Sequence, residues 1–113
     1  METNNVVLLR GTLTNDPVVR PLASGDSVTQ LELSTQVDGR AVSVPVSVPG
    51  HAVTVGRGDA VVVTGHVRRR FFRVGGLTQS RTEVLAAEVV KATRTRTVQR
   101  AIEGVLDAIG GTG

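Results

Sequence analysis

The chain has 113 residues and no cysteine, a length typical of one domain and a composition that excludes disulfide bonds and thiolate metal sites. Its net charge is +3, with 12 arginines against one lysine. Arginine presents a planar fork that suits phosphate oxygens and stacks on bases, although a GC-rich genome also replaces lysine with arginine. The first residues lack the features of a signal peptide, and no apolar run approaches the roughly 18 residues of a membrane span.

The apolar content is dominated by valine, which favours strands, and the polar and apolar residues alternate along several segments. Asp38-Gly39 is typical of a tight hairpin turn, and Gly75-Gly76 marks a second hairpin. A short extended piece ending at Arg20 follows the turn signal Asn15-Asp16-Pro17, and residues 50–59 are expected to form a loop. Five strands are predicted, at residues 5–14, 28–37, 42–49, 60–74 and 77–90. We expect an all-β domain closed into a small barrel, because closure removes exposed strand edges.

Residues 97–109 change from the two-residue period of a strand to a helical one. One apolar stripe is formed by Val98, Ile102, Val105, Leu106 and Ile109. Thr97 is expected to cap the start of the helix, and Gly110-Gly111 to end it. A glycine at position 104 weakens the helix by about 1 kcal/mol. We therefore expect an amphipathic C-terminal helix that forms only when docked on the barrel or on another subunit. The expected division is a barrel domain at 1–92 and a helical extension at 93–113.

The segment GHVRRRFFRVGG, residues 65–76, holds four arginines and both phenylalanines of the chain. Strand alternation places Phe71 on the side of the core valines, where it is expected to pack inward, and Phe72 on the opposite, exposed side, with Arg68 and Arg70. An exposed ring between guanidinium groups is what a single-stranded nucleic acid requires, a platform for a base and charges for phosphates. The same pattern also fits a cation–π pair, a subunit contact, or charges that protect a strand edge.

The order of motifs resembles the bacterial single-stranded DNA-binding protein family. The segments NNVVLLRGTLTNDPVVRPLASGDSVTQLELST, GRGDAVVVTGHVRRRFF and SRTEVLAAEVV carry the resemblance, which covers residues 4 to 90. It implies an oligonucleotide-binding fold (OB-fold), a five-stranded Greek-key barrel. It also implies a homotetramer or homodimer with the first strand at a subunit interface, and a cytoplasmic, nucleoid-associated location.

The resemblance also suggests which residues contact DNA. Phe72 matches a family tryptophan, and basic residues near DNA in the family correspond to Arg10, Arg20, Arg68, Arg70 and Arg73. Three other aromatic positions of the family are not aromatic here; they fall at Val37-Asp38-Gly39, near Ser43 and at Pro49. The acidic tail with which the family recruits partners does not appear in this sequence. At roughly 1–3 kcal/mol per stacked base, three missing platforms predict weaker, more salt-dependent binding.

The expected function is binding of single-stranded DNA without strong sequence preference, in replication, recombination or repair, with no cofactor. With roughly four arginines engaged, the slope of log K against log salt should be near −3. The sequence does not distinguish DNA from RNA as the bound nucleic acid. The alternative is an oligomeric interaction module on the same fold, similar to a primosomal accessory protein, that binds DNA weakly or not at all and pairs with itself or with a full-length relative.

An enzyme is not expected. His51 and His66 lack ligand spacing or a nucleophile partner, and the first is expected in a loop and the second on an exposed strand position. Several aspartates fall in turn segments, where this side chain bonds to backbone amides. The glycine pair at 75–76 is followed by a strand and therefore makes no phosphate loop.

Overall fold

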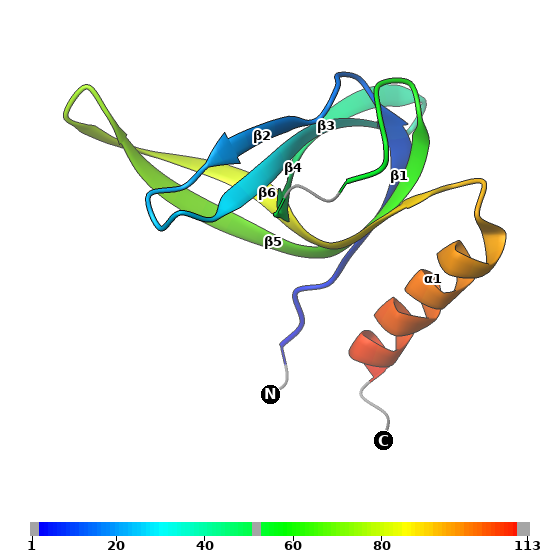
Figure 1. The fold of residues 1–113 in the computed structure, drawn as a ribbon. Helices are drawn as coiled ribbons and strands as arrows, with labels where there is room; N and C mark the ends of the chain where they lie inside the picture. The colour runs from blue at the N-terminus through cyan, green and yellow to red at the C-terminus, as the bar shows by residue number, and fades with distance from the viewer. Residues whose placement is uncertain (1–2, 51–52, 111–113) are drawn as a thin grey trace.

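The computed structural model describes residues 3–50 and 53–110, which form one sheet and one helix (Figure 1). The strands alternate polar and apolar side chains, and the helix begins where the apolar period becomes helical. The elements are β1 (Val7–Leu13), β2 (Val18–Pro21), β3 (Ser27–Val37), β4 (Arg40–Pro49), β5 (Ala60–Val74), β6 (Leu77–Lys91) and α1 (Thr95–Gly110). His51 and Gly111, which the sequence placed in a loop and at the helix end, lie outside the described residues.

The sheet closes into a five-stranded barrel because its strand order, β1-β5-β6-β4-β3-β2, is joined by an additional pairing of β1 with β3. That pairing joins Thr12 with Ser34 and Leu13 with Leu33. The short strand β2 pairs only with β3 and lies outside the barrel. The expected all-β class, with a closed five-stranded barrel and a C-terminal helix, is confirmed and is consistent with an OB-fold-like architecture.

The barrel core consists of alternate apolar residues from each strand. Its most deeply buried side chains include Leu33, Val61 and Val63, which are not exposed at all. The hairpin turn between β3 and β4 is confirmed, because Asp38 and Gly39 have φ angles of 52° and 78°. Other members of the core cluster are Leu13, Leu31, Val46, Val55, Val84 and Ala86.

Helix α1 covers the outer side of the barrel rather than its interior. It buries Val98, Ala101 and Val105, and a second apolar cluster joins Val98 to Val62 and Val90 of the sheet. The helix begins two residues before the expected start: the amide of Val98 donates to the carbonyl of Arg94 at 2.9 Å, so Thr97 lies inside the first turn and does not cap it. Only part of the predicted stripe therefore docks on the barrel, because Val98 and Val105 are buried whereas Leu106 and Ile109 are 60% and 51% exposed.

The two longest strands, β5 and β6, form a hairpin that projects beyond the barrel (Figure 1). At the barrel wall, Gly65 pairs with Ala86 while Thr64 pairs with Glu88, so β6 carries one extra residue, a β-bulge. The pairing of β4 with β6 comprises only Val46 with Val84 and Ser47 with Leu85. Beyond this point, residues 68–83 pair only within the hairpin, and we call this segment the hairpin arm.

Candidate nucleic-acid interface

The strand register brings polar residues from five strands to one outer face of the sheet. Directly paired residues point to the same side, and the pairs Gln30 with Ser47, Ser47 with Leu85, and Glu83 with Arg68 all share the side opposite the barrel core. The same alternation adds Arg20 of β2 and the ring of Phe72. We call this set the arginine face; it comprises Arg20, Gln30, Ser47, Arg68, Arg70, Phe72 and Glu83.

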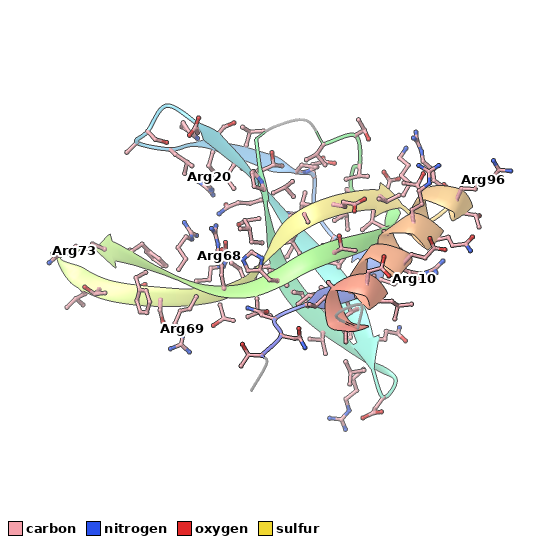
Figure 2. All side chains as sticks on the ribbon, turned by 90° about the horizontal axis from the view of Figure 1, so that it is seen from below. Arg10, Arg20, Arg68, Arg69, Arg73 and Arg96 are labelled. Atoms are coloured by element: carbon pink, nitrogen blue, oxygen red, sulfur yellow. The ribbon has the colours of Figure 1, made fainter. Side chains whose placement is uncertain are left out.

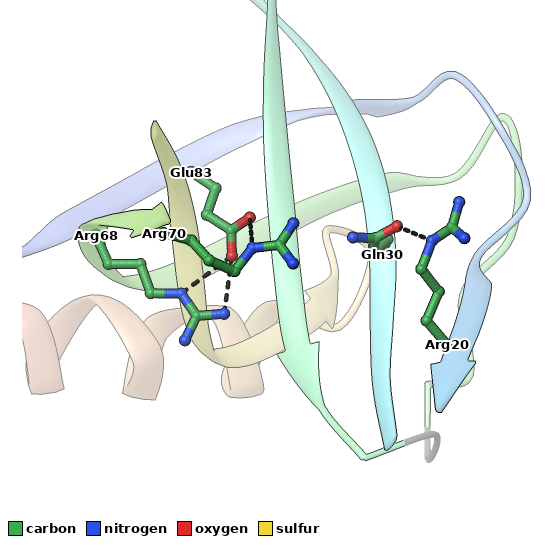
Figure 3. A network of polar contacts seen from close by, with 5 residues as sticks. All are labelled: Arg20, Gln30, Arg68, Arg70 and Glu83. Carbon is green, nitrogen blue, oxygen red and sulfur yellow. Dashed lines mark hydrogen bonds and ion pairs between the residues drawn. The ribbon is translucent and has the colours of Figure 1, made fainter. Parts of the chain in front are cut away.

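The carboxylate of Glu83 anchors two arginines of the arginine face (Figure 3). Its Oε2 accepts hydrogen bonds from Nε and a terminal nitrogen of Arg68, at 3.0 and 2.9 Å. The Nε of Arg70 lies 3.5 Å from Oε1 of the same carboxylate. The Glu83 side chain is 1% exposed, whereas both arginine side chains are 36% exposed. The carboxylate is thus buried beneath two guanidinium groups that remain open to solvent.

The environment of Glu83 favours its charged form. Burial raises the pKa of the carboxyl, but hydrogen bonds from Ser47 and Arg68 and the charges of Arg68 and Arg70 outweigh burial, so the pKa lies below its ordinary value. At neutral pH the ionised carboxylate keeps both guanidinium groups in place. It also offsets one of their two positive charges.

Phe72 lies beside the anchored pair, on the side that the sequence predicted. Its ring is half-buried rather than exposed, because the guanidinium carbon of Arg70 sits 5.5 Å from the ring centroid. This is the cation–π pair that the sequence left open as an alternative. Among the described residues, the guanidinium group of Arg70 makes no hydrogen bond; its Nε is buried against the carboxylate of Glu83, while the side chain as a whole is 36% exposed. Arg70 and Phe72 together offer a cation and a ring at one place.

A groove of about 620 Å³ is lined by both anchored arginines, Arg68 and Arg70. Arg68 and Arg70 form one wall, and the turn between β2 and β3 forms the other, including Leu22 and Asp26. The floor is largely apolar, with Val28, Pro49 and Leu85 together with Ser47. The groove therefore combines an apolar floor with a cationic wall.

Arg20 extends the same face onto β2. Its Nε donates to Oε1 of Gln30, which orients the guanidinium group on the far side of β3 from Arg70 (Figure 3). Arg20 is exposed, and Gln30 is half-buried. The structure thus places Arg20, Arg68, Arg70 and Phe72 on one face, four of the six residues that the sequence indicated.

The other two predicted residues lie elsewhere. Arg10 of β1 pairs with Val62 of β5 and lies beside α1, away from Arg20 and Arg68 (Figure 2). Arg73 lies near the tip of the hairpin, on the side opposite Phe72, and donates to the carbonyl oxygen of Gly76 at 3.0 Å. Neither residue can therefore contact a ligand held only in the groove.

The expected burial of Phe71 is wrong, because its ring is 66% exposed. The alternation itself holds, since Phe71 shares the side of Val61 and Val63 along an uninterrupted β5. However, the ring lies in the hairpin arm, where β4 no longer pairs with β6 and no core lies beneath the strand. The prediction assumed that the barrel continues as far as the strand does.

Glu83 was not recognised from the sequence, although a signal for it exists. A tight turn at Gly75-Gly76 pairs Val74 with Leu77, and counting back along both strands sets Glu83 opposite Arg68. A carboxylate directly across from an arginine is a favourable cross-strand pair. Gln30 and Ser47 join this face only because β4 pairs with both β3 and β6. The pairing of β4 with β6 links segments distant in sequence, so no local pattern indicates it.

Comparison with known proteins assigns no family: no protein-family model matches the chain, and no curated protein sequence matches it significantly. Within residues 3–50 and 53–110, no group of three or more histidine, aspartate or glutamate side chains is placed to hold a metal ion. No helix in that part of the chain is long and apolar enough to cross a membrane. His66 is exposed on β5, as expected.

Proposed function

We propose that the protein binds single-stranded DNA without strong sequence preference, in replication, recombination or repair, and that the arginine face is its contact surface. The observation that carries this proposal is the pair of guanidinium groups held by Glu83 next to the ring of Phe72, at the wall of an apolar groove. Phosphates would lie against the arginines, and a base would stack at Phe72 and Arg70.

The buried anchor supports this role because it prepares the arginines before any ligand arrives. A flexible arginine loses side-chain entropy when it is immobilised on binding, about 0.5–1.5 kcal/mol per side chain. Glu83 already holds Arg68 by two hydrogen bonds and Arg70 by an ion pair of 3.5 Å. A ring flanked by cations contacts base faces and phosphates, which every nucleotide offers, so such contacts carry little sequence preference.

The charges on the arginine face support modest, salt-dependent binding. Arg20, Arg68 and Arg70 contribute three positive charges, of which Glu83 offsets one, and Asp26 lies at the opposite wall of the groove. Only one ring is present on this face, so base stacking contributes less than in a site with several aromatics. Electrostatic contact with phosphates must then supply most of the affinity.

A second candidate function is favoured by the exposed side of α1. Leu106 and Ile109 are 60% and 51% exposed, although they belong to the apolar part of the helix. Such side chains fit a contact with another subunit, which would make the chain an interaction module that pairs with itself or with a full-length single-stranded DNA-binding relative. Self-association into a dimer or tetramer is also compatible with the first proposal.

Light scattering on the protein, with and without a long oligo-dT, separates the two candidates. The chain has a mass of 11.8 kDa, so the free protein reports its number of subunits directly. We expect the scattering mass to rise to that of a protein–DNA complex at low salt. An assembled protein whose mass does not change when oligo-dT is added would contradict DNA binding and support the interaction module.

A further inference from the structure

The side of the hairpin arm opposite the arginine face carries a second arrangement of cations around a ring. Cross-strand pairs place Arg69 with Thr82, Phe71 with Ser80, and Arg73 with Thr78, all on this side. Figure 2 shows Arg68 and Arg69 pointing to opposite sides of the hairpin. We call this surface the hairpin underside; it comprises Arg69, Phe71, Arg73, Thr78, Ser80 and Thr82.

Phe71 is the central feature of the hairpin underside, and among residues 3–50 and 53–110 its ring makes no ring or cation–π contact. It is 66% exposed, since the arm has left the barrel before this residue is reached. An exposed phenylalanine alone needs no explanation. Here, however, arginines occupy the positions two residues before and two residues after it, which in a strand places them on the same side.

The charges of the hairpin underside are not balanced by neighbouring carboxylates. Within the described residues, Arg69 makes no hydrogen bond or ion pair, and Arg73 donates only to the carbonyl of Gly76. The three residues paired across from Arg69, Phe71 and Arg73 all bear hydroxyl groups, which can donate to phosphate oxygens. The one carboxylate of the arm, Glu83, faces the other side.

This chemistry selects a nucleic acid over a second copy of the chain as the occupant. Two copies meeting through this side would bring Arg69 and Arg73 together with their equivalents, and like charges in contact are unfavourable. A single strand offers what the surface lacks, negative phosphates for the arginines and a flat base for the ring.

We infer that the hairpin underside is a second contact for single-stranded nucleic acid, occupied by the continuation of a strand that is first bound on the arginine face. This inference rests on the proposed function. A strand long enough to pass around the hairpin arm would enclose it, with Phe72 contacting one segment and Phe71 another. A strand that fills only the groove would not reach Phe71.

The test compares two labelled oligo-dT probes of about 6 and about 16 nucleotides, lengths at the lower and upper ends of what one barrel of this kind contacts. Phe71→Ala should weaken binding of the longer probe by about 5- to 150-fold, the effect of losing one base stack, and should leave the shorter probe unchanged. The matched control is Leu77→Ala, which removes a 69% exposed side chain from the same arm without removing a ring. This control should change neither affinity.

The outcomes separate the inference from the proposed function. If the unaltered protein binds neither probe at low salt, DNA binding itself is contradicted and the inference falls with it. If Phe72→Ala weakens both probes but Phe71→Ala weakens neither, the proposed function stands and the second contact is wrong. Equal losses for both probes in Phe71→Ala would also contradict the second contact. A change in oligomeric mass in Phe71→Ala with unchanged affinities would identify the underside as a protein contact and overturn the inference.

Discussion

Glu83 and Arg68, fifteen residues apart in sequence, are joined by two hydrogen bonds of 3.0 and 2.9 Å to a single carboxylate oxygen. The carboxylate is buried, whereas the guanidinium group is partly exposed. Because Arg70 lies against the other oxygen, one buried charge organises two cations that face solvent. The candidate site therefore depends on a residue that a ligand would not need to touch.

Replacing Glu83 should make the fold less stable and less sensitive to acid. Its pKa is lowered in the folded protein, so its charge stabilises the fold above the ordinary glutamate pKa of about 4.3, and this stabilisation is lost as the pH falls through the lower folded value. Glu83→Gln should reduce the free energy of unfolding by about 1–3 kcal/mol at pH 7, a difference that shrinks in acid. Chemical denaturation at several pH values measures this.

The control for this experiment is Glu88→Gln, which alters an exposed carboxylate on the same strand and should have little effect. A Glu83→Gln variant as stable as the parent at pH 7, with the same acid dependence, would show that the buried carboxylate does not stabilise the fold.

Phe72→Ala should weaken binding of single-stranded DNA by about 1–3 kcal/mol, the loss expected for one stacked base. The substitution should lower the free energy of unfolding by about 0.5–1 kcal/mol, since the ring is half-buried and its partner, Arg70, is a partly exposed cation. Because the chain has no tryptophan or tyrosine, a labelled oligonucleotide provides the signal. Unchanged affinity together with an unchanged fold would remove Phe72 from the interface.

Phe71→Ala should leave the free energy of unfolding within about 0.5 kcal/mol of the parent, because most of the ring is already in water. A buried phenylalanine would cost about 3–5 kcal/mol when truncated, so thermal or chemical denaturation distinguishes the two cases clearly. A loss in the larger range would mean that the ring packs against another part of the protein or a second subunit.

Two glycines should respond in opposite directions when changed to alanine. A Cβ at Gly65 would overlap the backbone carbonyl of Leu85 next to the β-bulge, so Gly65→Ala should destabilise the fold by about 1–3 kcal/mol. At Gly104, inside α1, a Cβ would meet nothing within 4 Å, and Gly104→Ala should stabilise the fold by about 0.5–1 kcal/mol. The two melting temperatures, compared with the parent, test the bulge and the helix separately.

Most of the fold was predictable because its signals are local. Alternation and the turn at Asp38-Gly39 indicated the long strands and their hairpin, and a helical period identified α1. The start of the helix was misplaced, because threonine at 97 looks like a cap while Arg94 accepts the first hydrogen bond. The preference of threonine for a capping position has less influence on where a helix begins than the packing of its first turn.

The candidate site was only partly predictable. Alternation placed Arg68, Arg70 and Phe72 together, but it could not show where the barrel ends beneath β5, and so Phe71 was assigned to the core. The distance between Arg10 and this face depends on how β1 joins β5, which no local pattern determines. The groove required the approach of the β2–β3 turn to the hairpin arm, a contact between segments distant in sequence.

The salt dependence of binding to a labelled oligo-dT of about 6 nucleotides tests the central claim most directly. Arg20, Arg68 and Arg70 face this short ligand, and three neutralised phosphates give a slope of log K against log salt of about −2. This is shallower than the slope near −3 expected from four arginines, because Arg10 and Arg73 lie away from the arginine face. Saturable binding at low salt with a slope near −2 is the predicted result. No binding at low salt, or binding that does not weaken as salt rises, would contradict the account.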